Sequence, residues 1–307
     1  LQATHAILNV GRSIGDEPTL ISQLVRAACG QIAAASCIRI LALVDSKTSI
    51  SELAELQTAF AKEAEEPLLL YALRGERAVW HLTLENIDNG KLQEYELSQG
   101  ATRVKRGVQD RVESWLLQGF DPGRQAKFLE LMSKSIVAAK FPPHKQLEAI
   151  RQVERELKSL RSTLWESFRY YRIGFLFPAT ELLTEKSLRS RAELVTAVAA
   201  IACERFRLSQ GRWPTSLNEI PKELLPAIPT DPFNGEPIRL AKQPDGIVVF
   251  SVGLEESKDA FDKKPHIGPL GGQEVGWQLY DPEHRGLPAL PYMPRPKAEP
   301  KSDENEP

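Results

Sequence analysis

The chain has 307 residues, of which 42% are hydrophobic and 26% charged, and its formal net charge is −2. These values are close to the averages of soluble globular proteins, so a core of ordinary size is expected. The basic residues are dispersed, whereas nucleic-acid binding needs a concentrated positive face, so no nucleic-acid partner is expected. No stretch approaches the roughly 18 apolar residues of a membrane span, so no span is expected in this chain either.

The chain begins at Leu1 rather than at methionine. We therefore expect it to be a processed or excised part of a longer protein, and an upstream signal peptide or anchor helix is compatible with this start. Its three cysteines, Cys29, Cys37 and Cys203, have no metal-binding or redox spacing. We interpret them as small buried hydrophobic residues.

Residues 1–183 have the pattern of a multi-helix N-terminal domain. Apolar residues recur at three- and four-residue steps, which indicates amphipathic helices. Helices are predicted over about 16–44, 49–64, 68–87, 108–120, 124–141 and 145–171. Pro18 is expected in the first turn of the first of these helices, and Ser51 is expected to cap the second. A long loop is expected over 88–107, where three glycines interrupt the pattern.

A further helix is predicted over about 186–209, and its apolar residues cover so wide an arc that other elements must pack on more than one side of it. Prolines and glycines then become dense, and short β-type runs occur at 236–241, 246–252 and 275–280. Pro244, Asp245 and Gly246 are typical of a hairpin connection between the first two runs. From Arg285 onward the chain is proline-rich and then charged, which favours disorder.

The predicted fold class is therefore mainly α. Residues 1–183 form a helical domain, and 184–284 form a small α+β module of one long helix and a short antiparallel sheet. Residues 285–307 form a disordered tail.

Three short motifs follow one another in this module. They are Gly211-Arg212-Trp213-Pro214, the run Pro229-Thr230-Asp231-Pro232-Phe233-Asn234-Gly235-Glu236-Pro237, and Ser251-Val252-Gly253. In this order and spacing the region of about 186–262 resembles the globular domain of type II secretion major pseudopilins. Residues before this region carry no resemblance that we recognise.

The corner between the long helix and the next element has a physical interpretation of its own. Gly211 is expected to end the helix in a left-handed conformation, and Pro214 prevents the helix from continuing. Ser216 and Glu219 are expected to form a capping box for a short helix. Trp213 is expected to fill the space between the long helix and the hairpin.

The resemblance implies a further feature, because pseudopilins commonly follow the S-x-G motif with a calcium-binding loop. In this chain the corresponding loop lacks the usual Asp-Gly and Gly-Gly elements and contains Lys258. Glu255, Asp259 and Asp262 are the candidate ligands, since calcium prefers several oxygen ligands from one flexible loop. The alternative is a solvated acidic loop without calcium, and no other cofactor is expected.

Motifs for catalysis are absent from the sequence. It contains no G-x-S-x-G, P-loop, G-x-G-x-x-G or H-E-x-x-H pattern, and its five histidines are scattered singly. We therefore expect a non-enzymatic protein that acts in assembly, with a protein partner or with itself, at the bacterial cell envelope or outside the cell. A cytoplasmic location stays open.

Two alternatives also stay open. The first is a hydrolase-type enzyme with its site between the helical domain and the β module. The second is a glycan-binding module, in which Trp213, Phe233, Phe250 and Trp277 would offer rings for stacking. The competing interpretation of these four side chains is that they fill the core of the small module.

Overall fold

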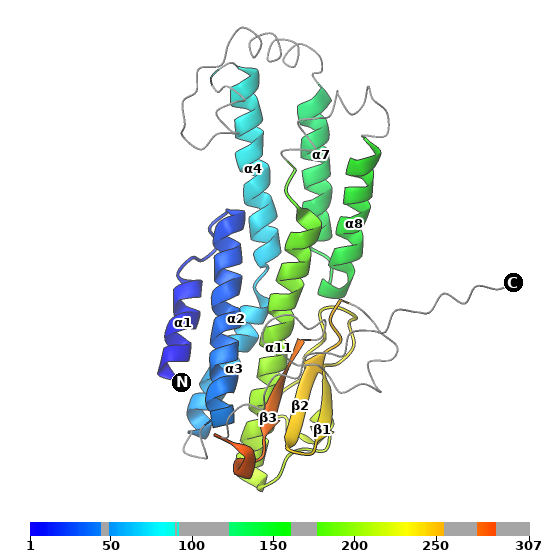
Figure 1. Cartoon of the computed structure of the whole chain (residues 1–307). Helices are drawn as coiled ribbons and strands as arrows, with labels where there is room; N and C mark the ends of the chain where they lie inside the picture. The colour runs from blue at the N-terminus through cyan, green and yellow to red at the C-terminus, as the bar shows by residue number, and fades with distance from the viewer. Residues whose placement is uncertain (44–48, 90, 92–122, 161–176, 255–274, 287–307) are drawn as a thin grey trace, which may run out of the picture.

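The computed structural model describes residues 1–43, 49–89, 91, 123–160, 177–254 and 275–286. These residues form a mainly helical protein with a small three-stranded antiparallel sheet, which confirms the predicted fold class (Figure 1). The helices are α1 (Gln2–Arg12), α2 (Leu20–Leu43), α3 (Ile50–Glu65), α4 (Leu68–Asp88), α7 (Gly123–Ala138), α8 (Pro143–Ser159) and α11 (Thr180–Gln210). The strands are β1 (Arg239–Gln243), β2 (Gly246–Ser251) and β3 (Val275–Tyr280), and the 3-10 turns are η1 (Leu217–Glu219) and η2 (Pro282–His284).

The helices lie side by side along one long axis, and the sheet packs against the C-terminal part of α11 (Figure 1). Helices α3 and α4 follow one another, and Pro67 separates them because it cannot continue the hydrogen-bonding of α3. The N-terminal end of α2 rests against α4 at Gly75. A Cβ atom at Gly75 would lie 1.6 Å from the carbonyl oxygen of Pro18, so only glycine permits this approach.

The helix ends differ in detail from those predicted. Ser51 lies inside α3, whose N-cap residue is Ser49, and no side-chain hydrogen bond caps this helix. Pro18 precedes α2, and the hydroxyl of Thr19 accepts a hydrogen bond from the Ser22 amide at its first turn. The predicted helix at 108–120, most of the predicted loop at 88–107 and the end of the predicted helix at 145–171 lie outside the described residues.

Helix α11 is the longest described helix and is buried over most of its length. It contacts α2, α3, α4 and α8, and also β2 and β3, so the prediction that it is covered on several sides is confirmed. The helix starts at Thr180, so the predicted division between residues 183 and 184 falls within its first two turns. One core cluster contains Leu56 and Phe60 of α3 together with Val249 of β2 and Leu279 of β3.

The sheet has the order β1-β2-β3, and both pairs are antiparallel. Strands β1 and β2 form the predicted hairpin, in which Gln243 pairs with Gly246 across Pro244 and Asp245. Every residue of β2 is buried, which its continuous apolar run Ile247–Phe250 explains, since β2 is the central strand with α11 nearby.

Asp231 holds the second and third sequence motifs together. Its buried carboxylate accepts hydrogen bonds from the Phe233 amide at 2.9 Å, the Ser251 hydroxyl at 2.9 Å and the Val252 amide at 2.8 Å. The aspartate of the first loop thus satisfies donors of the chain that leaves β2. This explains in physical terms why the two motifs occur together.

The corner after α11 is partly as predicted. Gly211 ends the helix with φ 71°, in the left-handed region that favours glycine. The prediction of a capping box is wrong, because the Ser216 side chain makes no cap hydrogen bond to η1. Instead the Glu219 carboxylate accepts hydrogen bonds from the amide and the hydroxyl of Thr215 and pairs with Arg212, which together lower its pKa to about 2.

Arg285 belongs to the folded protein and not to the tail that the sequence places after residue 284. Its side chain is 2% exposed, and its guanidinium donates to both carboxylate oxygens of Glu204 on α11, at 2.9 and 2.8 Å. The proline and charge pattern of the C-terminal sequence does not predict this contact, because Glu204 lies 81 positions away from Arg285 in the sequence. Residues 287–307 lie outside the described residues.

Replacement of Asp231 tests its role in joining the two motifs. Asp231→Ala leaves buried donors without their charged acceptor, so we expect the free energy of unfolding to fall by about 3 kcal/mol. Urea denaturation measures this change. Glu236→Ala, which removes an exposed carboxylate from the same loop, is the control and should change little. Equal effects of the two substitutions would contradict the role of Asp231.

Candidate functional site

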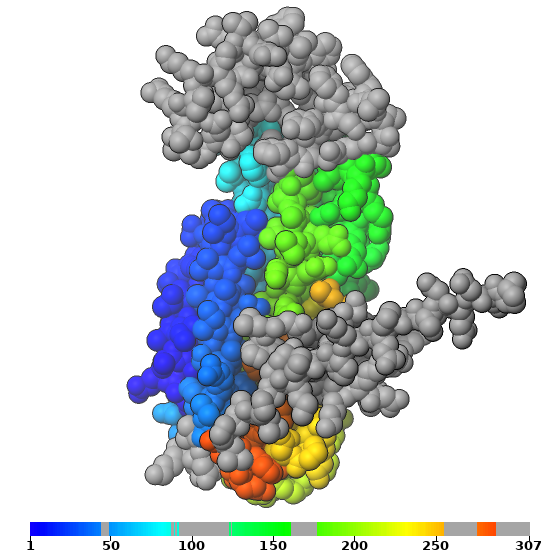
Figure 2. Space-filling view, viewed as in Figure 1, coloured from blue at the N-terminus to red at the C-terminus, as the bar shows by residue number. Residues whose placement is uncertain are grey.

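The outward side of α2 is apolar except at Arg39. Ile21 is 74% exposed, Val25 48%, Ile32 55% and Leu43 58%. At 100° per residue these positions fall on one stripe of the helix. With the further exposed residues of the same stripe they form a surface that we call the α2 face, which consists of Ile21, Leu24, Val25, Ala28, Ile32, Arg39 and Leu43. Arg39 is its single charged residue, and α2 is uncovered beside α1 in Figure 2.

The inward side of α2 is fixed by packing and by polar contacts. Ala33, Ala34, Cys37 and Leu41 are buried in the core shared with α11. The side-chain amide of Gln23 donates to the carbonyls of Gly15 and Glu17. The orientation of the helix is therefore set, and the α2 face is directed outward.

An ion pair between helices strengthens this arrangement. The Arg26 guanidinium donates to both carboxylate oxygens of Glu63 on α3, at 2.7 and 3.1 Å, and both side chains are buried. Arg12 of α1 donates to the same carboxylate at 3.1 Å. Burial disfavours the charged form of Arg26, but the hydrogen bonds and charge of Glu63 raise its pKa overall. Three helices are thus joined at one buried carboxylate.

Helix α2 is also the one described helix that is long and apolar enough to cross a membrane by length and composition, with a mean hydropathy of 1.4. A core helix or a signal sequence meets the same criterion, and 39% of the apolar window is buried here. The sequence of α2 is not one uninterrupted apolar stretch, because Arg26, Gln31 and Arg39 divide its apolar residues. A helix with so many apolar residues is normally covered on most of its surface, and the outward side of α2 is not.

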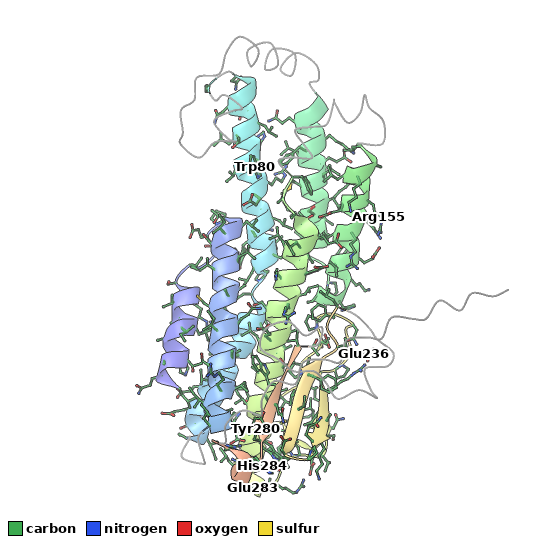
Figure 3. All side chains as sticks on the ribbon, in the orientation of Figure 1. Trp80, Arg155, Glu236, Tyr280, Glu283 and His284 are labelled. Atoms are coloured by element: carbon green, nitrogen blue, oxygen red, sulfur yellow. The ribbon has the colours of Figure 1, made fainter. Side chains whose placement is uncertain are left out.

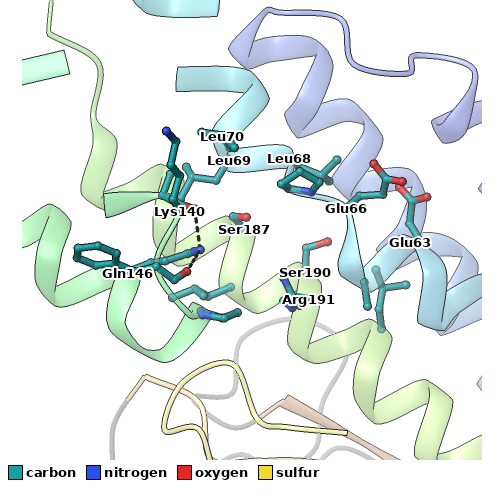
Figure 4. Close-up of a pocket in the computed structure, with 17 residues that line it drawn as sticks. Glu63, Glu66, Leu68, Leu69, Leu70, Lys140, Gln146, Ser187, Ser190 and Arg191 are labelled. Carbon is teal, nitrogen blue, oxygen red and sulfur yellow. Dashed lines mark hydrogen bonds between the residues drawn. The ribbon is translucent and has the colours of Figure 1, made fainter. Parts of the chain in front are cut away.

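A cleft of about 300 Å³ lies on another part of the molecule (Figure 4). Its walls come from the α3–α4 corner, from the α7–α8 corner and from α11. Ser187, Ser190 and Arg191 line it from α11, and Lys140 and Gln146 line it from the α7–α8 corner. The Gln146 amide donates to the carbonyls of Ala139 and Phe141 and so closes that corner.

A buried charge cluster lies near the C-terminal end of α11. The Glu204 carboxylate accepts two hydrogen bonds from Arg207 and two from Arg285. Burial opposes ionisation of Glu204, but these hydrogen bonds lower its pKa. The Arg207 guanidinium also lies 5.3 Å from the centre of the Trp213 ring, and the Trp213 indole donates to Asp281 at 2.6 Å. Both oxygens of the Glu204 carboxylate and the Trp213 indole have hydrogen-bond partners within the protein, so we assign this cluster a structural role.

Among the described residues, those that the sequence singled out are not brought together into one site. The calcium candidates Glu255, Asp259 and Asp262 lie outside the described residues. The aromatic side chains serve packing: Phe250 is buried, and Trp213 and Trp277 pack against the core, while Phe233 is half-buried.

The cysteine interpretation is confirmed for two of the three residues. Cys37 and Cys203 are fully buried, whereas Cys29 is half-buried. Burial raises the pKa of the Cys37 thiol to about 12 and that of Cys203 well above its usual value. Both thiols therefore stay protonated and unreactive near neutral pH.

Asp281, Glu283 and His284 are the described residues whose spacing suits a metal ion, with ligand atoms within 4.8 Å of one another. Figure 3 shows Glu283 and His284 near the end of the sheet that Tyr280 marks. Glu283 and His284 are exposed, and Asp281 already accepts the Trp213 hydrogen bond. Such exposed groups are common without a metal, and this group carries no proposal.

Comparison with known proteins identifies no relative: no family model, no curated protein and no solved structure matches this chain.

The Glu204 cluster makes a testable contribution to stability. Arg285→Met removes one of two partners of a buried carboxylate, so we expect the free energy of unfolding to fall by about 3 kcal/mol near neutral pH. The folded pKa of Glu204 is below the ordinary value of 4.5, so its stabilisation is complete above about pH 4.5 and is lost as the pH falls further. The variant should therefore lose less stability than the wild type on acidification.

Chemical denaturation at several pH values measures both effects. Arg155→Met is the matched control, because the Arg155–Glu148 pair is exposed and contributes little. An Arg285→Met protein that is as stable as the Arg155→Met protein would contradict a structural role for the cluster.

Proposed function

We propose that this chain is a non-enzymatic assembly protein that associates with a second copy of itself through the α2 face. The observation that carries the proposal is a helix of 24 residues whose outward stripe is apolar and whose inward side is fixed by the Arg26–Glu63 ion pair. Exposure of this much aliphatic surface to water is unfavourable. Large apolar patches on protein surfaces mark sites of interaction.

A second copy suits this face better than a charged partner would. The face carries Arg39 and no acidic residue, so it lacks the alternating charges that select a different protein. The small side chain of Ala28 lies one turn before Ile32 and permits close approach of two helices. A twofold axis would place the same apolar residues opposite one another, as in the common symmetric dimers.

Arg39 favours an antiparallel arrangement of the two helices. In a parallel pair the two Arg39 guanidinium groups would face one another and repel. In an antiparallel pair centred on Ile32 they would lie about 21 Å apart at 1.5 Å per residue, beyond the range of strong repulsion in salt. Each Arg39 would then lie opposite Val25 of the other copy.

The resemblance of residues 186–262 to pseudopilin domains is the basis for the location that we propose, which is the bacterial cell envelope or the outside of the cell. The long helix, the glycine corner and the hairpin occur in the order of that resemblance. Pseudopilins function by assembly, which agrees with a self-associating chain. The glycan alternative has less support, because Trp213, Phe250 and Trp277 are used in packing.

The oligomeric state tests the proposal. We expect the wild type to be a dimer by sedimentation equilibrium at roughly 100 μM, and Ile32→Lys to weaken association at least about 30-fold, the effect of losing roughly 2 kcal/mol at an interface centre. Leu82→Lys on α4 is the matched control, since Leu82 is 58% exposed and lies outside the α2 face. A monomeric wild type, or a dimer unaffected by Ile32→Lys, would exclude the proposal.

Cross-linking tests the antiparallel arrangement. Ile32→Cys places two thiols at the twofold axis, so we expect rapid formation of a disulfide-linked dimer under mild oxidation. Ile21→Cys should cross-link poorly, because the two positions would lie about 33 Å apart. The wild type controls for Cys29, which is half-buried. Preferential cross-linking at position 21 would instead indicate a parallel pair.

A further inference from the structure

Arg191 of α11 is half-buried, and its surroundings differ from those of the buried Arg26 and Arg285. Arg26 and Arg285 each contact a carboxylate within 3 Å. Among the described residues no carboxylate lies within 4 Å of the Arg191 guanidinium, and none accepts a hydrogen bond from it. Burial lowers the pKa of Arg191, and Glu65 opposes this shift only from a distance. A guanidinium that loses water without gaining a partner costs free energy.

Arg191 lies in the wall of the 300 Å³ cleft between the α3–α4 corner, the α7–α8 corner and α11 (Figure 4). Ser187 lies one turn before it on the same helix, and among the described residues its hydroxyl has no hydrogen-bond partner. Lys140, from the α7–α8 corner, adds a second positive charge without an ion pair within the described part of the chain. Hydrogen-bond donors thus exceed acceptors in this part of the wall.

The carboxylates that border the cleft do not neutralise these groups. Both oxygens of Glu63 already accept from Arg12 and Arg26. Glu66 lies 3.5 Å from Arg26. The two arginines balance these two carboxylates, so the group adds no net charge at its end of the cleft.

The remaining wall is apolar. The cleft is lined by Leu68, Leu69, Leu70, Phe141, Leu188 and Leu194. Its volume is at the lower end of the range for small-molecule sites. A ligand would therefore have one anionic group and a small apolar body.

We propose that this cleft binds a small carboxylate with an apolar body, whose carboxylate pairs with Arg191. The planar guanidinium matches the two oxygens of a carboxylate, and the Ser187 hydroxyl provides a further donor nearby. The apolar body would lie against the leucines and Phe141. A free acid and the C-terminal carboxylate of a peptide share this chemistry. The proposal is independent of self-association through the α2 face.

Binding of hexanoate to the full chain tests the proposal, with hexanamide as its uncharged counterpart. We expect titration calorimetry to detect hexanoate binding that is at least about tenfold tighter than hexanamide binding, because only the acid pairs with the guanidinium. N-acetyl-leucine, which carries the carboxylate of a peptide end, distinguishes the two sources by its affinity relative to hexanoate. Inorganic phosphate should bind more weakly than hexanoate. Equal binding of acid and amide, no binding of either acid, or tighter binding of phosphate would overturn the proposal.

Two variants separate a binding role of Arg191 from a structural one. Arg191→Met should abolish the preference for hexanoate and, without ligand, should raise the melting temperature by roughly 2–4 °C, because a half-buried charge without an ion-pair partner is removed. Arg191→Lys should retain part of the preference. Arg189→Met is the control on the same helix, since Arg189 pairs with Glu193, and it should leave hexanoate binding unchanged. A lower melting temperature for Arg191→Met with unchanged hexanoate binding would show that Arg191 has a structural role only.

Discussion

The complete burial of one stretch of α11 is the constraint on which the rest of the structure depends. Ala197 and Ala199 to Cys203 are fully buried, which requires neighbours on every side of the helix. Helix α3 and α2 supply them from the N-terminal part of the chain, and β2 and β3 supply them from the C-terminal part. The small side chains of this stretch let these neighbours approach closely, and the result is one core cluster that includes residues of α1, α2, α3, α11 and the sheet.

Polar contacts hold the neighbours in place around α11. The Gln57 amide of α3 donates to the Leu224 carbonyl, and Ser190 of α11 donates to the Ala27 carbonyl of α2. The Trp277 indole of β3 donates to the Glu193 carbonyl of α11. Each contact joins parts of the chain that are far apart in sequence. Since α2 must present one side to α11 and to Glu63, its other side is left in contact with water, and the proposed self-association follows from this.

Much of the fold was predictable because its signals are local. Apolar periodicity indicated α2, α3, α4, α7 and α11, and the run from Pro244 to Gly246 indicated the hairpin. The cap at Ser51 was wrong, because the Ser49 and Ser51 hydroxyls hydrogen-bond to each other and not to the amides of α3. The box of Ser216 and Glu219 was wrong, because the Glu219 carboxylate accepts from Thr215 instead.

The candidate sites were not predictable in the same way. Apolar residues occur on more than one side of α2, and the sequence gives no indication of which side will stay uncovered, so the α2 face depends on the tertiary packing. Arg191 is one of many arginines in the sequence. Its surroundings depend on how the α3–α4 corner, the α7–α8 corner and α11 come together, and these segments are far apart in the sequence. Asp231 belongs to the second sequence motif, but the hydrogen bond that it accepts from the Val252 amide depends on the position of the hairpin.

The central claim is that the N-terminal helices and the sheet form one cooperative unit around α11. Native-state hydrogen exchange of the full chain tests it most directly, by comparison of the amides of Leu56–Phe60 in α3 with those of Ile247–Phe250 in β2. The account predicts that both groups exchange with the same free energy of opening and the same dependence on urea, because they share one core. Exchange of the β2 amides at a clearly lower free energy, while α3 stays protected, would show that the sheet opens as a separate unit and would contradict the account.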